Sequence, residues 1–109
     1  MAIKANILID QGADFSTTIN VTDDDGDIID LTGYTSAAQL RKHYTSTSQT
    51  AFTTSISPLI GTLTLSMNAA TTADITSGRY VYDVELTSNT SVITRLVEGI
   101  VTVTPQVTK

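Results

Sequence analysis

The chain has 109 residues, with six Lys and Arg against eleven Asp and Glu, a formal net charge of −5 and no cysteine. So few cations argue against binding to a nucleic-acid backbone, and the lack of cysteine excludes disulfides and thiolate metal sites. The length predicts a single domain, residues 1–109, with 40% hydrophobic residues available for its core.

The N-terminal segment, residues 1–13, contains one short apolar run, Ile7, Leu8 and Ile9. The run is shorter than the apolar core of a secretory signal, and no stretch approaches the ~18 apolar residues of a membrane span. We therefore expect synthesis in the cytoplasm and no membrane partner. A short apolar end segment can add to the edge of a sheet, so residues 1–13 are predicted to be a docking or exchanging arm with these three residues at an interface.

Period-two alternation begins in "DFSTTINVT", where Phe15, Thr17, Ile19 and Val21 share one face. This pattern is typical of a half-buried strand. The following "DDDGD", residues 23–27, predicts a tight hairpin turn because Asp and Gly tolerate left-handed backbone angles.

The acidic turn also raises the question of a calcium site. An EF-hand loop with Gly26 at its sixth position would begin at Val21 and end at Thr32, and neither supplies the required carboxylate. The EF-hand is therefore excluded, and a solvated turn is the simpler interpretation of this stretch. The carboxylates that remain as candidate calcium ligands are those of Asp23, Asp25 and Asp27. No other metal and no cofactor is predicted.

The middle of the chain predicts a strand and then an exposed loop. In "TSAAQLRK" the inward positions are Ala38 and Leu40, whereas "HYTSTSQT", residues 43–50, is polar and lacks a core pattern. Tyr44 in this loop is a candidate interface residue. His43 is the only histidine, and no G-x-S-x-G motif accompanies it, so we predict no catalytic residues and no enzymatic activity.

A second strand and a helical turn follow. "GTLTLSMN" places Leu63, Leu65 and Met67 on one face, and "AATTADITSG", residues 69–78, predicts a helical turn that Gly78 would close.

The segment "SGRYVYDVELTS" then places two tyrosines on one strand face. A helical corner followed by Gly-x-Tyr-x-Tyr resembles the E–F corner of immunoglobulin-like sandwiches, in which the first tyrosine hydroxyl binds nearby backbone. Tyr82 stands where antibody domains have their second cysteine, so no inter-sheet disulfide is expected. The predicted core residues are Phe15, Ile19, Leu63, Leu65, Tyr80, Tyr82, Val84 and Leu86.

The last strand, from about residue 92 to 104, would pair with the tyrosine strand across "SNTS". It places Ile93, Val97, Val101 and Val103 on one face, but Arg95 interrupts that face and Leu96 and Ile100 lie on the other. This pattern predicts either a β-bulge near Gly99 or a strand with contacts on both faces. Six to eight short strands without a long helix predict an all-β, immunoglobulin-like antiparallel β-sandwich with a short helical turn at the E–F corner.

Three stretches, "DDDGDIIDLTGYTSAAQLRK", "GTLTLSMNAATTADITSGRYVYDVEL" and "TRLVEGIVTVTPQVTK", resemble a group of small tailed-bacteriophage and prophage proteins. The resemblance covers roughly residues 10 to 109. In layout the chain is similar to the immunoglobulin-like N-terminal domain of phage baseplate upper proteins.

The resemblance implies a non-enzymatic structural protein of a phage virion, in the tail, baseplate or neck or as a capsid decoration subunit. Its implied partners are other virion proteins and copies of itself, and its implied location is a particle assembled in the bacterial cytoplasm. The alternative is a host-surface or glycan-binding module that uses the loops at residues 43–50 and 88–91.

Overall fold

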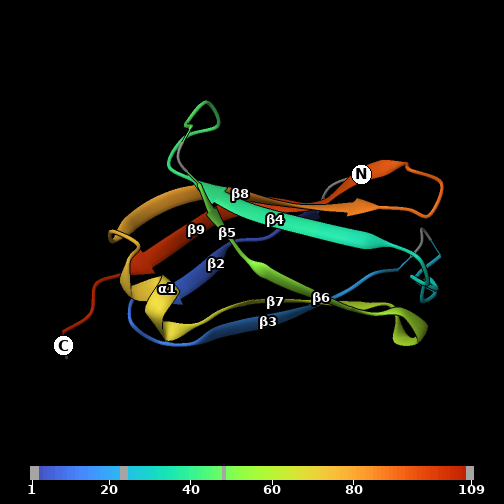
Figure 1. Ribbon diagram of the computed structural model, residues 1–109, viewed down its shortest axis with the longest axis horizontal. Coiled ribbons are helices and arrows are strands. Elements are labelled where there is room, and N and C mark those ends of the chain that lie inside the picture. The colour runs from blue at the N-terminus through green and yellow to red at the C-terminus, as the bar shows by residue number, and fades with distance from the viewer. Residues whose placement is uncertain (1–2, 23–24, 48, 108–109) are drawn as a thin grey trace.

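The chain folds into two β-sheets packed face to face (Figure 1). The computed structural model describes residues 3–22, 25–47 and 49–107. Sheet A contains β1 (Ile3–Lys4), β2 (Ile7–Asp10), β4 (Thr35–Arg41), β5 (Thr50–Ala51), β8 (Gly78–Thr87) and β9 (Ile93–Thr104). Sheet B contains β3 (Phe15–Asn20), β6 (Thr53–Ser57) and β7 (Thr62–Met67). The helical pieces are the 3-10 turn η1 (Pro58–Ile60) and α1 (Ala69–Ala73).

The predicted immunoglobulin-like sandwich is confirmed. Sheet A runs β1-β9-β8-β4-β5 with β2 also on β9, and sheet B runs β3-β7-β6. The N-terminal strands β1 and β2 pair with β9 in parallel, whereas the other strand pairs are antiparallel. No helix among the described residues is long and apolar enough to cross a membrane.

Alternating apolar side chains of both sheets form the core. Most of the predicted core residues are buried: Leu63, Leu65, Tyr82, Val84 and Leu86. The other three are partly buried and pack against this cluster: Phe15, Ile19 and Tyr80. Burial of such side chains is the main force that holds the sheets together.

A strand that changes sheets was not anticipated from the sequence. Residues 50–51 pair with β4 of sheet A, residues 53–57 pair with β7 of sheet B, and Phe52 between them enters the core. The Phe52 ring lies 6.1 Å from Phe15 and 6.2 Å from Tyr82 between ring centroids. The stretch "TAFTTSIS" has only two large apolar residues, so its periodicity was too weak to identify a strand.

The helical corner has the geometry of a tyrosine corner. The Asn68 side chain accepts a hydrogen bond from Thr71 N at 2.8 Å and caps α1. The Tyr80 hydroxyl donates to the Thr76 carbonyl at 2.5 Å. The predicted role of Gly78 is wrong: Asp74 ends α1, and Gly78 is the first residue of β8, paired with Val103.

The β-bulge lies nearer the hairpin than predicted. Val84 pairs with Val97 and Glu85 with Arg95, so Leu96 is the extra residue and Gly99 pairs regularly with Tyr82. The extra residue reverses the alternation of β9. Arg95 therefore lies on the outer face of sheet A. The expectation that Ile93 joins the core is also wrong, since it is 65% exposed beside the hairpin turn.

The N-terminal arm belongs to sheet A, because its strands β1 and β2 both pair with β9. Hydrogen bonds hold the kink between these two strands in place. Tyr82 donates its hydroxyl hydrogen to the Ala5 carbonyl at 2.6 Å, and Ala5 N donates to the Glu98 carbonyl at 2.9 Å. The Ala5 carbonyl lies over Gly99, where a Cβ would overlap its oxygen. Glycine at position 99 thus permits this close approach.

The turn after β2 is held by a buried hydroxyl and an amide. Thr72 of α1 is 0% exposed, donates to the Ala13 carbonyl at 2.9 Å and accepts from Gly12 N at 3.0 Å. Gln11 donates to the Ile75 carbonyl at 2.8 Å and accepts from Gln106 N at 3.0 Å. These contacts connect the arm to both the helical corner and the C-terminal segment.

We expect the variant Tyr82→Phe to lose about 1 kcal/mol of unfolding free energy, the usual net value of one hydrogen bond. Burial raises the pKa of the Tyr82 phenol above its usual value, so the folded state favours the neutral form. The stability that Tyr82 contributes is therefore complete below about pH 10 and falls as the pH rises through its raised pKa. Urea titrations from pH 7 to 11 should show a shallower alkaline decline for Tyr82→Phe than for the parent. The exposed control, Tyr44→Phe, should follow the parent, and identical curves for Tyr82→Phe and the parent would contradict this role.

Candidate interaction surfaces

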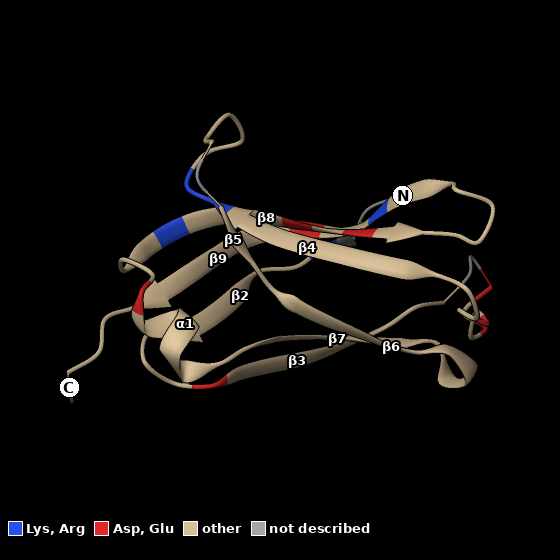
Figure 2. Ribbon diagram, in the orientation of Figure 1, with Lys and Arg blue, Asp and Glu red and all other residues tan. Residues whose placement is uncertain are grey.

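The two sheets present outer faces of opposite character. Every described Lys and Arg belongs to a strand of sheet A or follows one directly: Lys4, Arg41, Lys42, Arg79 and Arg95. No charged residue occurs in β3, β6 or β7. Figure 2 shows this difference, with blue and red segments on β8 and β9 and a uniformly tan sheet B. The charge distribution therefore divides the surface by sheet.

The outer face of sheet A is divided again along β8. Arg79, Val81, Asp83 and Glu85 point outward in that order, because they alternate with core-facing residues. The cationic end is extended by Arg41 of β4, which pairs with Val81, whereas Lys42 in the loop after it lies over the Tyr80 ring, on the core side of β8. The anionic end is extended by Glu98 of β9, which pairs with Asp83. The carboxylates of this end are interleaved with two cations, because Arg95 pairs with Glu85 and Lys4 pairs with Glu98.

Side-chain contacts hold the cationic end in place. Arg41 donates to the Ser46 carbonyl at 2.5 Å and to Gln39 Oε1 at 3.1 Å. Lys42 Nζ lies 5.0 Å from the Tyr80 ring centroid and donates to the Arg79 carbonyl at 3.1 Å. This position gives a cation–π contact.

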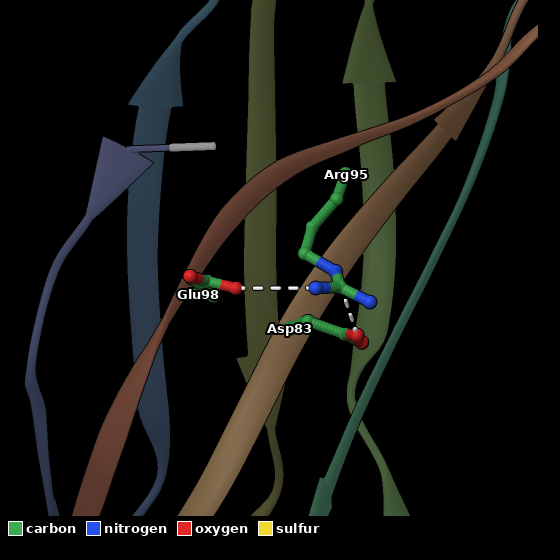
Figure 3. Close-up of polar contacts among 3 residues, drawn as sticks. All are labelled: Asp83, Arg95 and Glu98. Atoms are coloured by element: carbon green, nitrogen blue, oxygen red, sulfur yellow. Dashed lines mark hydrogen bonds and ion pairs between the residues drawn. The ribbon is translucent and has the colours of Figure 1, made fainter. Parts of the chain in front are cut away.

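One arginine bridges two carboxylates at the anionic end (Figure 3). Arg95 Nε lies 3.4 Å from Asp83 Oδ2, and Arg95 Nη1 lies 3.3 Å from Glu98 Oε2. All three side chains are partly open to solvent, so each pair contributes about 0 to 1 kcal/mol. The bulge at Leu96 places Arg95 here.

A depression of ≈ 180 Å³ lies on this face. The residues that line it include Arg41, Val81, Asp83 and Arg95, and Tyr44 contributes from the loop at residues 43–49. Tyr44 is 79% exposed. Its large, accessible ring keeps it a candidate interface residue.

The outer face of sheet B is a grid of short, uncharged polar side chains. Three aligned rows cross its strands. The outward residues are Ser16, Thr18 and Asn20 of β3, Thr62, Thr64 and Ser66 of β7, and Thr53, Ser55 and Ser57 of β6. The hydroxyls of Thr18 and Thr64 lie 3.3 Å apart. We call this grid the hydroxyl face.

Strand β3 forms an open edge of sheet B. Within the described residues it pairs with β7 alone. A groove of ≈ 290 Å³ separates this edge from the kinked arm. The groove is lined by Ala5, Asn6 and Ile7 of the arm, Thr17, Thr18 and Ile19 of β3, and Tyr82 and Val97. Unpaired strand edges accept further strands, and β3 has no Lys or Pro to prevent this.

The structure distributes the predicted arm residues over three environments. Leu8 is 62% exposed and Ile7 is partly buried against the core. Ile9 is not an interface residue: it is 0% exposed, because β2 pairs with β9 and directs this side chain between the sheets. In the single chain, therefore, the predicted exchanging arm pairs with β9 of the same chain and is part of sheet A.

Several apolar side chains at one end of the sandwich were missed. They come from the turn regions: Ile28, Leu59, Ile60, Val92 and Ile93 are each more than half exposed. Figure 1 places these turns at the end of the molecule opposite α1. Period-two patterns do not identify such residues, because they lie at the ends of strands rather than within them.

The described residues of the acidic turn and the lone histidine form no recognisable site. Asp25 and Asp27 are exposed, and Asp23 lies outside the described residues. A bridge between Thr22 and Ile28 is consistent with the predicted tight turn. Across the ranges that the structure covers, no three His, Asp or Glu side chains come together to hold a metal. His43 is exposed in its loop.

The two loops of the glycan-binding alternative lie at opposite ends of sheet A. Arg41, directly before the first loop, pairs with Val81, whereas Thr87, directly before the second, pairs with Thr35 at the other end of β4. Figure 1 shows them well separated along the long axis. A single small ligand would not contact both.

Comparisons with known proteins give structural likenesses only. No family model and no curated protein matches the sequence. Among solved structures, the chain is similar to internalin-like protein lmo2027 of Listeria monocytogenes, at 14% identity and a TM-score of 0.46. The likeness covers 94% of this chain and 28% of that protein, so the chain spans less than a third of its length.

Proposed function

We propose that this chain is a non-enzymatic structural protein of a bacteriophage virion, where it acts through protein–protein contacts made by sheet B. The observation that carries the proposal is the hydroxyl face together with the open edge of β3. Its partners are neighbouring virion proteins and copies of itself.

Two physical properties suit sheet B to docking. Interface cores are depleted in charged residues, and β3, β6 and β7 contain none. Ser and Thr side chains also have less rotamer freedom to lose on burial than Lys or Glu. A partner that hydrogen-bonds these hydroxyls therefore meets a smaller entropic penalty than it would on a face rich in Lys or Glu.

The open edge of β3 would fix the orientation of the partner on this face. An extended partner segment beside β3 would gain main-chain hydrogen bonds, and its alternate side chains would enter the groove lined by Ile7, Ile19 and Val97. Repetition in a symmetric particle allows modest contacts of this kind to give a stable assembly.

The viral setting rests on the sequence resemblance over residues 10–109. The proposed location is accordingly the virion, after assembly in the bacterial cytoplasm. Mass spectrometry of purified particles from the native source should detect the chain in a fixed ratio to the major structural proteins. Its absence from the particles would overturn the setting.

A matched pair of variants tests the docking strand. Thr17→Lys places a charge on the groove side of β3, and an inward-pointing charge is a natural means of preventing strand addition. We expect this variant to fold but to be incorporated into particles at roughly a tenth of the parent level, which corresponds to about 1.4 kcal/mol of lost contact energy.

The control is Ala73→Lys, which adds the same charge on the exposed end of α1. It should be incorporated like the parent. Thermal unfolding of both purified variants checks that they fold. Normal incorporation of a folded Thr17→Lys variant would show that β3 is not the docking strand.

A further inference from the structure

We propose that the depression on the outer face of sheet A binds one neutral sugar ring, with Tyr44 as the residue on which the ring stacks. The site uses the loop at residues 43–49 and not the distant loop at residues 88–91. It is separate from the docking contacts of sheet B and does not rest on them. The two sheets pack face to face, so a partner on the hydroxyl face leaves this depression open (Figure 1).

The floor and one side of the depression are formed by β8 and β4. Val81 and Asp83 are outward residues of β8, and β4 places Arg41 beside Val81 and Gln39 beside Asp83. The other side is formed by β9, whose Glu98 pairs with Asp83. The space is ≈ 180 Å³, whereas sites for drug-sized ligands have about 300 to 1,000 Å³. The depression therefore suits a single ring.

The charges that line the depression compensate one another. They are two guanidinium groups and two carboxylates, those of Arg41, Arg95, Asp83 and Glu98. Arg95 lies within 3.4 Å of both carboxylates (Figure 3). Next to these groups in the sheet, Lys4 pairs with Glu98 and Glu85 pairs with Arg95, one further charge of each sign. An ion that approached its counter-charge here would also meet a group of its own sign, so the site favours an uncharged ligand.

The polar groups are held in place before a ligand binds. Arg41 donates to the Ser46 carbonyl and to Gln39 Oε1, and Arg95 is held by the two carboxylates. Side chains that are already ordered lose little further rotamer entropy on binding. A guanidinium group only donates and a carboxylate only accepts, whereas a hydroxyl does both. A ring with several hydroxyls can therefore hydrogen-bond to both kinds of group at once.

One apolar and one aromatic side chain complete the match. Val81 contributes to the floor, and Tyr44 borders the space from the loop. Tyr44 is 79% exposed, so its ring has surface left to bury. A pyranose carries C–H groups on its faces and hydroxyls around its rim, and stacking one face on an aromatic ring removes apolar surface of both from water. A wholly apolar ligand would instead leave the polar groups of the depression without partners.

Titration of the purified, isotope-labelled chain with simple sugars tests the site. The probes are the methyl glycosides of glucose, galactose, N-acetylglucosamine and rhamnose, and amide chemical shifts report binding. At least one probe, added to about 50 mM, should shift the amides of Tyr44 and residues 81–83 with a dissociation constant of about 1 to 20 mM. Glycine and sulfate, added at matched ionic strength, should leave these amides unchanged.

Two variants of Tyr44 isolate the contribution of its ring. Tyr44→Ala removes the stacking surface and should weaken binding of the same glycoside about fivefold or more. Tyr44→Phe keeps the ring and should bind within about twofold of the parent. Thr18→Ala, on the hydroxyl face, is the distant control and should bind like the parent. Thermal unfolding of each variant checks that it folds.

Three results would contradict the sugar site. These are the absence of shifts at Tyr44 and residues 81–83 with all four glycosides, equal binding by the parent and a folded Tyr44→Ala variant, or tighter binding of glycine or sulfate at the same residues. Incorporation of Tyr44→Ala into particles should equal that of the parent. A chain that enters particles but binds no sugar would therefore leave the proposed function intact and remove this site alone.

Discussion

The variant Gly99→Ala is expected to lose about 1 to 3 kcal/mol of unfolding free energy, the usual effect of overpacking. A Cβ at this position would overlap the Ala5 carbonyl oxygen and lie 2.8 Å from its carbon. The kinked arm must then move away from β9. That movement breaks the hydrogen bond from Tyr82 to Ala5 and the one from Ala5 N to Glu98.

Urea denaturation measures the loss, and amide hydrogen exchange locates it. Exchange of the Ala5 amide should accelerate more than exchange within β3 or β7, because only the arm is displaced. Thr94→Ala, an exposed change in the same strand, is the control and should stay within about 0.5 kcal/mol of the parent. A Gly99→Ala chain with parental stability and exchange would show that the arm does not depend on this glycine.

The variant Thr72→Val is expected to lose a similar amount, about 1 to 3 kcal/mol. It keeps the shape of a side chain that is 0% exposed but removes its hydroxyl. The Ala13 carbonyl then loses a donor and Gly12 N loses an acceptor. A polar group left without a partner is more damaging than the removal of a complete pair.

The comparison with Thr72→Ser separates the hydroxyl from the methyl group. Serine retains both hydrogen bonds and loses one methyl, so it should be the more stable variant of the two in urea. If valine proved at least as stable as serine, the hydrogen bonds of Thr72 would not hold the turn after β2.

The strands that the sequence predicted well are those with strict alternation. β3, β7 and β8 each bury every second residue or pack it against the core, because a half-buried strand allows no other pattern. The tyrosine corner was also predictable from local sequence, because its helical turn and its Gly-x-Tyr-x-Tyr motif follow each other directly in the chain. The absence of charge in sheet B was also visible in the sequence, once its three strands are known to be neighbours.

The residues that make up the candidate interaction surfaces depend on strand pairings, and local sequence patterns do not encode these pairings. The position of the bulge decides whether Arg95 faces the core or the solvent, and this position follows from the register between β8 and β9. The arm residue Ile9 was assigned to an interface because nothing local shows that β2 pairs in parallel with β9. The strand around Phe52 was missed because it has only two large apolar residues, and its pairing is divided between the two sheets.

The sequence by itself determined the class of fold, the turn positions and most of the buried residues, because period, glycine placement and aromatic spacing act over a few neighbouring residues. The tertiary structure alone decided which strands are adjacent, and hence where charges gather, which edge stays open and why residue 99 carries no side chain. Adjacency between β2 and β9 joins residues more than ninety positions apart, and such contacts arise only when the whole core closes.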